Sequence, residues 1–154
     1  MIKNLKKNKY FTNMAHNREE YREARAARSA EKDEIIKRYG VNSDEMKAWE
    51  TREKQFAFPF SYGQLAALRS WENSVNHNSG EFECEDLPVE EHIASFLHTL
   101  KAARIKTFVV TERSTALMAN LYLIANMGWK MEEVCVLKRD EGSKPVYGIR
   151  FSVN

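Results

Sequence analysis

The C-terminal stretch 105–153 constrains the fold more than any other part of the chain. Residues 146–153 alternate apolar and other side chains, which is typical of a strand with one buried face. Apolar residues recur at helical spacing over 115–127, and Gly128 follows as a helix-ending residue. Together with a β-rich run at 106–111, these patterns predict a strand followed by a helix and by further strands.

The run 130–139 carries apolar residues on both faces, which predicts a central or well-covered strand. A polar turn connects it to the strand 146–153, so the stretch predicts a β-α-β-β unit. A parallel pair of strands connected through the helix 115–127 is expected to cross over with a right hand. The whole pattern predicts an α+β fold with a small mixed sheet covered by helices.

The N-terminal half of the chain has helical patterns throughout. Residues 18–39 are rich in Ala, Glu, Arg and Lys and are followed by Gly40, which predicts a charged helix. Ser43 and Ser61 are candidate caps for the next two helices. The helices predicted before the C-terminal stretch span 18–39, 43–57, 62–76 and 89–103, and residues 81–86 are a candidate edge strand.

Composition indicates a folded chain whose charge is polarised along its length. Hydrophobic residues make up 43% and charged residues 30% of the 154 residues, which excludes global disorder. Residues 1–40 hold 11 Lys/Arg and 6 Asp/Glu, a net charge of +5, and residues 41–154 hold the remaining 13 and 16, a net charge of −3. We therefore expect a basic arm, loose unless something holds it, and a charged helix at 1–40, followed by a single α+β domain at 41–154.

The basic residues of the first part are suited to follow a phosphate backbone, because Tyr10, Phe11 and Tyr21 are interleaved with them. The plainer interpretation is a solvated tail and a surface helix with internal ion pairs, since Glu19 and Glu20 weaken the positive field. On the first interpretation, the residues that contact nucleic acid or a protein partner are Lys3, Lys6, Lys7, Lys9, Arg18, Arg22, Arg25 and Arg28.

The loop 111–115 lies where a predicted strand runs into a helix start. Free N–H groups at a helix start favour an anion, so Arg113, Ser114 and Thr115 form a candidate phosphate or carboxylate site. The alternative is that a hydroxyl group caps the helix and Arg113 is solvated. The loop has no glycine-rich sequence and no following lysine, which distinguishes it from a P-loop.

The helices 43–57 and 62–76, joined by a short segment, also allow a helix-turn-helix interpretation. In that case polar residues of the second helix would read bases. Packing against a core is the simpler account of Trp49 and Trp71 in these helices. The candidate base readers are Gln64, Arg69, Asn73 and Asn76.

Metal-binding and catalytic motifs are absent from the sequence. His92 and His98 are six residues apart, which does not place both on one helix face, and no HExxH pattern occurs. Cys84 and Cys135 are far apart and predict neither a disulfide framework nor a zinc site. We expect no metal, no cofactor and no catalytic residue, and a small enzyme or anion binder at 112–115 is a secondary alternative. No apolar run approaches about 18 residues, so we expect no membrane span and a cytoplasmic location.

The segment FVVTERSTALM, followed by a helix and by GW-K-MEEV, resembles small uncharacterised proteins of phages and other mobile elements of Gram-positive gut bacteria. The resemblance covers roughly the last 60–70 residues. It implies no catalytic residues. It implies a protein that acts by binding, and anti-CRISPR inhibitors of host defence are one such class.

The leading prediction is a non-enzymatic binding protein of phage or mobile-element type that inhibits a host CRISPR-type complex. Its partner is expected to be a protein, in particular a host nucleoprotein complex, contacted through the basic arm and the charged helix. The alternative prediction is an accessory protein that binds nucleic acid directly through the same residues.

Overall fold

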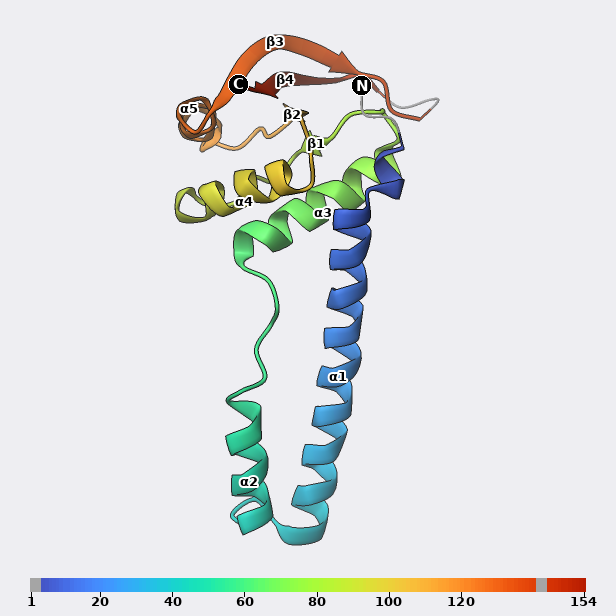
Figure 1. The fold of residues 1–154 in the computed structure, drawn as a ribbon, viewed down its shortest axis with the longest axis vertical. Helices are drawn as coiled ribbons and strands as arrows, with labels where there is room; N and C mark the ends of the chain where they lie inside the picture. The colour runs from blue at the N-terminus through green and yellow to red at the C-terminus, as the bar shows by residue number, and fades with distance from the viewer. Residues whose placement is uncertain (1–3, 141–143) are drawn as a thin grey trace. The chain divides into compact units, whose positions relative to one another are not determined.

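The computed structural model describes residues 4–140 and 144–154 (Figure 1). The chain divides into two compact units. Residues 1–13 and 60–154 form one, here called the sheet unit, and residues 14–59 form the other, here called the hairpin unit. This division differs from the one expected after residue 40, because the N-terminal segment packs with the C-terminal part of the chain.

The sheet unit contains a four-stranded mixed sheet, so the predicted α+β fold class is confirmed. Its strands are β1 (Glu83–Cys84), β2 (Thr107–Val110), β3 (Trp129–Leu137) and β4 (Val146–Val153), in the order β1-β2-β4-β3. β1 and β2 are parallel, whereas β4 pairs antiparallel with both β2 and β3. β2 and β3 therefore run in the same direction, as predicted for the two strands connected through the helix, and β4 lies between them.

Three helices accompany the sheet: α3 (Tyr62–His77), α4 (Glu90–Ala102) and α5 (Leu117–Asn126). The predicted capping box at Ser61 is confirmed, because its side chain accepts from the Gln64 N–H and the Gln64 side chain accepts from the Ser61 N–H. α3 and α4 approach closely at Gly63. A Cβ atom there would lie 2.6 Å from Cβ of Ser95 and 2.7 Å from the backbone of α4, so only glycine fits.

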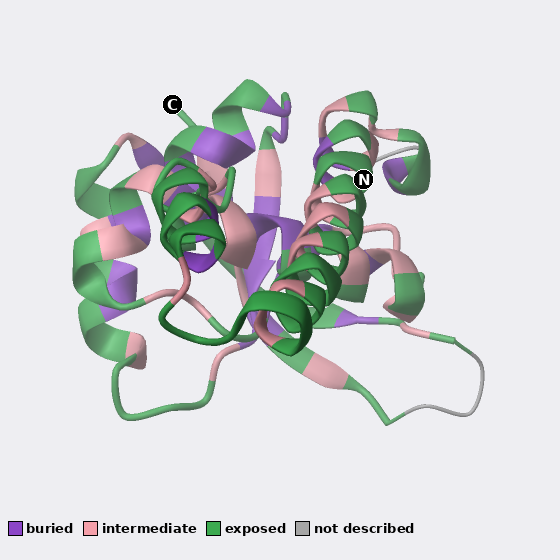
Figure 2. Cartoon of the chain, turned by 90° about the horizontal axis from the view of Figure 1, so that it is seen from below, coloured by how far each residue is buried: buried purple, intermediate pink, exposed green. Residues whose placement is uncertain are grey.

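Aromatic side chains fill the core of the sheet unit. Phe108 of β2 stacks on Phe151 of β4, with ring centroids 5.6 Å apart, and meets Trp129 of β3 edge to face at 4.8 Å. Figure 2 shows buried residues on the strands and on helix faces. The expectation that β3 is a central or well-covered strand is wrong. β3 is one of the two edge strands, and Val134 and Val136 are exposed.

The N-terminal segment packs against this core, although the sequence suggested a loose arm. It forms a 3-10 turn, η1 (Leu5–Lys7), and the start of α1 (Lys9–Tyr39). Phe11 is fully buried and stacks on Trp71 of α3 and on Phe82, with centroid distances of 5.7 and 5.8 Å. α1 begins at Lys9 rather than at residue 18, because the Asn8 side chain caps it by accepting from the Phe11 N–H at 3.2 Å.

The hairpin unit consists of the remainder of α1 and of α2 (Asp44–Glu53), which ends before the predicted boundary at residue 57. The predicted Ser43 cap is confirmed, since its hydroxyl accepts from the Met46 N–H. The Glu53 carboxylate pairs with Arg25 and lies 2.6 Å from Nε of Arg28. Few apolar residues of this unit are buried, so charged and aromatic contacts hold it together.

Truncation of Phe11 tests the docking of the N-terminal segment. We expect Phe11→Ala to lower the free energy of unfolding by about 3–5 kcal/mol, because it empties a fully buried aromatic site. Denaturant unfolding followed by circular dichroism measures this change. Phe11→Leu, which keeps most of the buried volume, serves as the control and should cost markedly less. A decrease below about 1 kcal/mol for the alanine variant would contradict the docked segment.

Glu53 makes the hairpin unit sensitive to acid. The hydrogen bonds from Arg25 and then Arg28 hold the pKa of Glu53 below its ordinary value. A lowered pKa stabilises the folded state above the unfolded pKa, and this contribution disappears as pH falls below about 4.5. We therefore expect the protection factors of the α2 amides, which are the intrinsic exchange rates divided by the observed rates at the same pH, to fall on acidification. In Glu53→Gln, these protection factors should be low already at neutral pH.

Glu50→Gln is the matched control for this experiment, because Glu50 is an exposed carboxylate on the same helix. This variant should keep the exchange rates of the natural chain at neutral pH. Equal protection of α2 in both glutamine variants would show that the Glu53 pairs do not hold the hairpin.

Candidate phosphate-binding site

The N-terminal segment and the end of α4 enclose a pocket of about 620 Å³ within the sheet unit. Two hydrogen bonds fix its walls. The Asn8 side chain donates to the carbonyl oxygen of Ala103 at 3.0 Å, and Nε1 of Trp71 donates to the carbonyl oxygen of Leu5 at 2.9 Å. We call this site the basic pocket. Its polar lining residues are Asn4, Lys7, Asn8, Lys9, Tyr10 and Arg104.

Positive charge in the basic pocket is not neutralised by its lining. Lys7, Lys9 and Arg104 are exposed, and no acidic residue occurs among the described residues that line the pocket. The pocket lies where two segments without Asp or Glu come together, residues 1–18 and residues 92–111. A cluster of one sign in a concave site concentrates the field and attracts anions.

The start of α1 adds to this positive potential. Lys9 and Tyr10 form the first turn of the helix and line the pocket. The first N–H groups of a helix have no partner within it, and the helix dipole places partial positive charge there. The Asn8 side chain accepts from the N–H of Phe11. The start of a helix of this length is therefore a favourable place for an anion.

Arg104 has a backbone conformation that favours glycine. Its φ angle is +61°, and the Ile105 N–H donates to the carbonyl oxygen of Leu100 at 2.9 Å, as at helix ends where glycine is usual. A side chain in this left-handed region costs about 1–2 kcal/mol. The chain nevertheless has arginine here, and its side chain lines the basic pocket. Backbone strain at a charged pocket residue points to a role for that side chain.

The structure separates the contact residues that the sequence suggested. Lys3 lies outside the described residues. Lys7 and Lys9 line the basic pocket, and Lys6 lines a neighbouring pocket of about 200 Å³ together with Asn4. The four arginines among the suggested residues belong to the hairpin unit instead.

Those arginines make contacts within the hairpin unit. Arg25 and Arg28 pair with Glu53, and the Arg28 guanidinium lies 5.4 Å from the centre of the Trp49 ring. Nη1 of Arg22 lies 3.7 Å from the Glu19 carboxylate. Residues 14–59 hold 10 Lys/Arg and 10 Asp/Glu, so the unit has no net charge. Arg22, Arg25 and Arg28 therefore pair with acidic residues of their own unit, and they do not form a continuous basic surface.

The predicted anion loop faces carboxylates. A pocket of about 420 Å³ is lined by Arg113, Ser114 and Arg139, but also by Glu85, Asp86 and Glu112. Of these residues, Arg139 is paired with Glu83. The Ser114 hydroxyl accepts from the Ala116 N–H at 3.3 Å, and the Asn120 side chain donates to Glu112 at 2.9 Å. Thr115 is exposed and is not part of the lining. Three acids in the pocket oppose an anion, so this loop is the weaker of the two candidate sites.

The residues proposed as base readers are not arranged as a helix-turn-helix would require. The predicted helices belong to different units, because α2 lies in the hairpin unit and α3 in the sheet unit. The Gln64 side chain is engaged in the capping box, whereas Arg69, Asn73 and Asn76 are not fully buried on α3.

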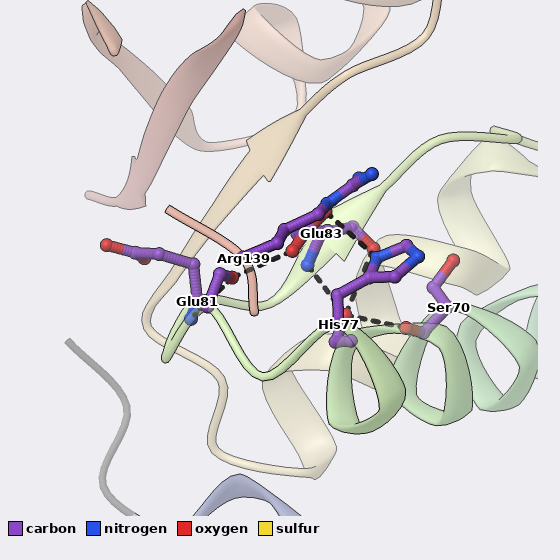
Figure 3. A network of polar contacts seen from close by, with 7 residues as sticks. Ser70, His77, Glu81, Glu83 and Arg139 are labelled. Atoms are coloured by element: carbon purple, nitrogen blue, oxygen red, sulfur yellow. Dashed lines mark hydrogen bonds and ion pairs between the residues drawn. The ribbon is translucent and has the colours of Figure 1, made fainter. Parts of the chain in front are cut away.

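A network around a buried carboxylate lies at the C-terminal end of α3 (Figure 3). Glu83 is 2% exposed and accepts hydrogen bonds from Oγ of Ser79 at 2.7 Å and from Nε of Arg139 at 3.1 Å. Nδ1 of His77 lies 3.2 Å from the same carboxylate. A buried carboxylate needs such partners, so this network joins α3, β1 and the end of β3 structurally.

Among the described residues, the cysteines and the other potential metal ligands do not form a second candidate site. Burial raises the pKa of the Cys84 thiol well above its ordinary value and also raises that of Cys135, so both stay protonated at neutral pH. Within 4–140 and 144–154, no group of three or more His, Cys, Asp or Glu is arranged to hold a metal ion. In the same ranges, no helix is both long and apolar enough to cross a bilayer.

Arg104 is the pocket residue that the sequence analysis missed. The signal was present in the segment KAARIK, because it places three cations around a helix end inside an acid-free stretch. A helix that ends without glycine, at an arginine, marks a residue kept for its side chain.

Comparison with known proteins adds a family but no activity. No curated protein and no solved structure is significantly similar to this chain. The matched family is described as a domain of unknown function, DUF7698, and its model covers residues 66–145. Arg104 and β3 lie inside the matched region, and Lys7 and Lys9 lie before it. Because the match covers more than half of the chain, the chain belongs to the DUF7698 family.

Proposed function

We propose that this chain is a non-enzymatic nucleic-acid-binding protein that holds a backbone phosphate in the basic pocket. The observation that carries the proposal is the strained Arg104, which stands beside Lys7 and Lys9 at the start of α1. Phosphate oxygens would accept hydrogen bonds from the guanidinium group and from the first N–H groups of the helix. The lysines supply further charge without fixed geometry.

The surroundings of the pocket favour a chain of phosphates over a single small anion. Lys6 lines the adjoining pocket, so the cations continue beyond one phosphate site. Tyr10 lines the basic pocket and is only partly buried. A cationic track beside an aromatic ring is how proteins hold single strands without reading their sequence. We therefore expect single-stranded nucleic acid to bind more tightly than duplex.

Inhibition of a host CRISPR-type complex stays a prediction from the sequence. The basic pocket is compatible with it, because such a complex carries nucleic-acid phosphates that the pocket would contact. An inhibitor that also contacts the protein part of the complex should bind the whole complex more tightly than its nucleic acid alone. Equal affinities for the two would count against such an inhibitor.

Arg104 variants test the proposed function without loss of the fold. We expect Arg104→Gly to raise the free energy of unfolding by about 1 kcal/mol, because it removes the strain, and to weaken binding about tenfold. Arg104→Ala should weaken binding equally without the gain in stability. Fluorescence anisotropy with a labelled oligothymidylate measures the affinity, and thermal unfolding measures the stability.

Arg113→Gln is the matched control, because it removes an exposed arginine of the other candidate site. Its affinity should stay within about twofold of the natural chain. The proposal fails if the Arg104 variants bind nucleic acid as tightly as the natural chain does. If only Arg113→Gln weakens binding, the result supports the alternative anion site at 112–115.

The salt dependence of binding reports how many phosphates the protein neutralises. We expect the logarithm of the affinity to fall linearly with the logarithm of the salt concentration. Each phosphate neutralised on a single strand adds about 0.7 to this slope, so the double variant Lys7→Gln/Lys9→Gln should reduce it by about 1.4. The control Lys37→Gln/Lys47→Gln removes two exposed charges of the hairpin unit and should leave the slope unchanged. Equal slopes in all three proteins would contradict a phosphate track at the pocket.

A further inference from the structure

One side of the β3 backbone is open. β3 is one of the two edge strands of the sheet, and among the described residues it pairs only with β4 (Figure 1). Sheet edges are usually protected by charges, bulges or proline. β3 has a bulge between Met131 and Glu133, but its last four residues, from Val134 to Leu137, pair regularly with β4 and carry no charge. This part of the edge is available to another strand.

Exposed apolar side chains lie beside the open edge. Val134 is 74% exposed and Val136 52% exposed. Val136 stands opposite Tyr147 of β4, which is 59% exposed. Residues that stand opposite each other in an antiparallel pair share one face, so these side chains form an apolar strip. Strips of this kind on a regular edge mark an interaction surface.

The sequence of β3 is complementary to itself in the antiparallel direction. With a two-fold axis at Cys135, Val134 stands opposite Val136 of a second copy. Counted along the chain, the same alignment sets Glu132 opposite the exposed Lys138, which follows the strand directly. Glu132 is the bulged residue of β3, and its carboxylate accepts a hydrogen bond from Ser152 of its own chain. The apolar pairs at Val134 and Val136 therefore contribute more to the alignment than this charge pair. A parallel alignment in register would instead place glutamates beside the same glutamates. Charge and apolar pairing therefore both favour the antiparallel arrangement.

We propose that β3 pairs antiparallel with β3 of a second copy of this chain, about a two-fold axis at Cys135, and forms a homodimer. The pairing joins two four-stranded sheets and satisfies the open backbone groups of both edges. It stands on the edge strand and not on the basic pocket, so it goes beyond the proposed function. A dimer carries two basic pockets, which raises the avidity for a long polyanion.

Cys135 reports this arrangement directly. Residues opposite each other in antiparallel strands have Cα atoms about 4.5–5.5 Å apart, which lies within the range that a disulfide spans. Oxidation with diamide at alkaline pH, where the raised pKa of Cys135 still allows some thiolate, should therefore link the two copies. One S–S bond forms, and diamide takes up the two protons and two electrons that the thiols release. Cys84 is fully buried and should not react with diamide. Cys135→Ser should abolish the covalent dimer.

Sedimentation of the full chain over a concentration range measures the assembly without oxidation. We expect the mass of a dimer that dissociates on dilution. Val136→Lys should give a monomer, because it places like charges close together at the interface, and its circular dichroism should match that of the natural chain. Arg104→Gly should leave the dimer unchanged, which separates this proposal from the proposed function.

A charge exchange tests the alignment itself. Glu132→Lys and Lys138→Glu should each weaken the dimer about fivefold or more, because each variant places like charges opposite one another at two symmetric positions. The double variant Glu132→Lys/Lys138→Glu should restore the affinity. A structural role of either residue in its own chain would not give this restoration.

Three results would overturn the proposal. A monomer at about 100 µM would show that the edge does not pair with itself. A dimer that forms no Cys135 disulfide would require another surface. A dimer whose charge variants are not restored in combination would require another alignment.

Discussion

The stacking of Phe11 between Trp71 and Phe82 is the contact on which the arrangement of the sheet unit depends. It attaches the start of α1 to α3 and to the segment that leads into β1. Without this attachment, Lys7 and Lys9 would not stand beside the end of α4, and the basic pocket would have one wall. A buried hydrophobic contact thus creates a charged site at the surface.

Short-range patterns predicted much of the fold. The capping box at Ser61 and the strand at 146–153 were confirmed, because each depends on neighbouring residues only. The burial of that strand does not follow the predicted alternation, since Tyr147 and Val153 are exposed. The docking of Phe11 was not predictable in this way. Its partners Trp71 and Phe82 lie far along the chain, and a lone aromatic residue in a polar segment carries no periodic signal. β3 was misjudged because apolar residues on both faces occur in covered strands and also in an unprotected edge.

The candidate site was half predictable for the same reason. Lys7 and Lys9 were expected to make contacts, and both line the basic pocket. Arg25 and Arg28 belonged to the same charge pattern, but both form ion pairs with Glu53, which lies more than twenty residues away in the sequence. Charge counts along a sequence do not show which cations already have partners. The cations of the segment KAARIK were visible in the sequence, but nothing in it shows that Arg104 adopts a left-handed φ angle and lines a pocket with Lys7 and Lys9.

The Glu83 network has a consequence for how the sheet unit assembles. Arg139, its ion-pair partner, lies 56 residues away in the chain. A partly folded chain in which β1 is docked but β3 is not would therefore hold a buried carboxylate without its cation, at a cost of several kcal/mol. Such half-formed sheets should be sparsely populated. The chain thereby spends little time with its central strands uncovered, when stray pairing between molecules would lead to aggregation.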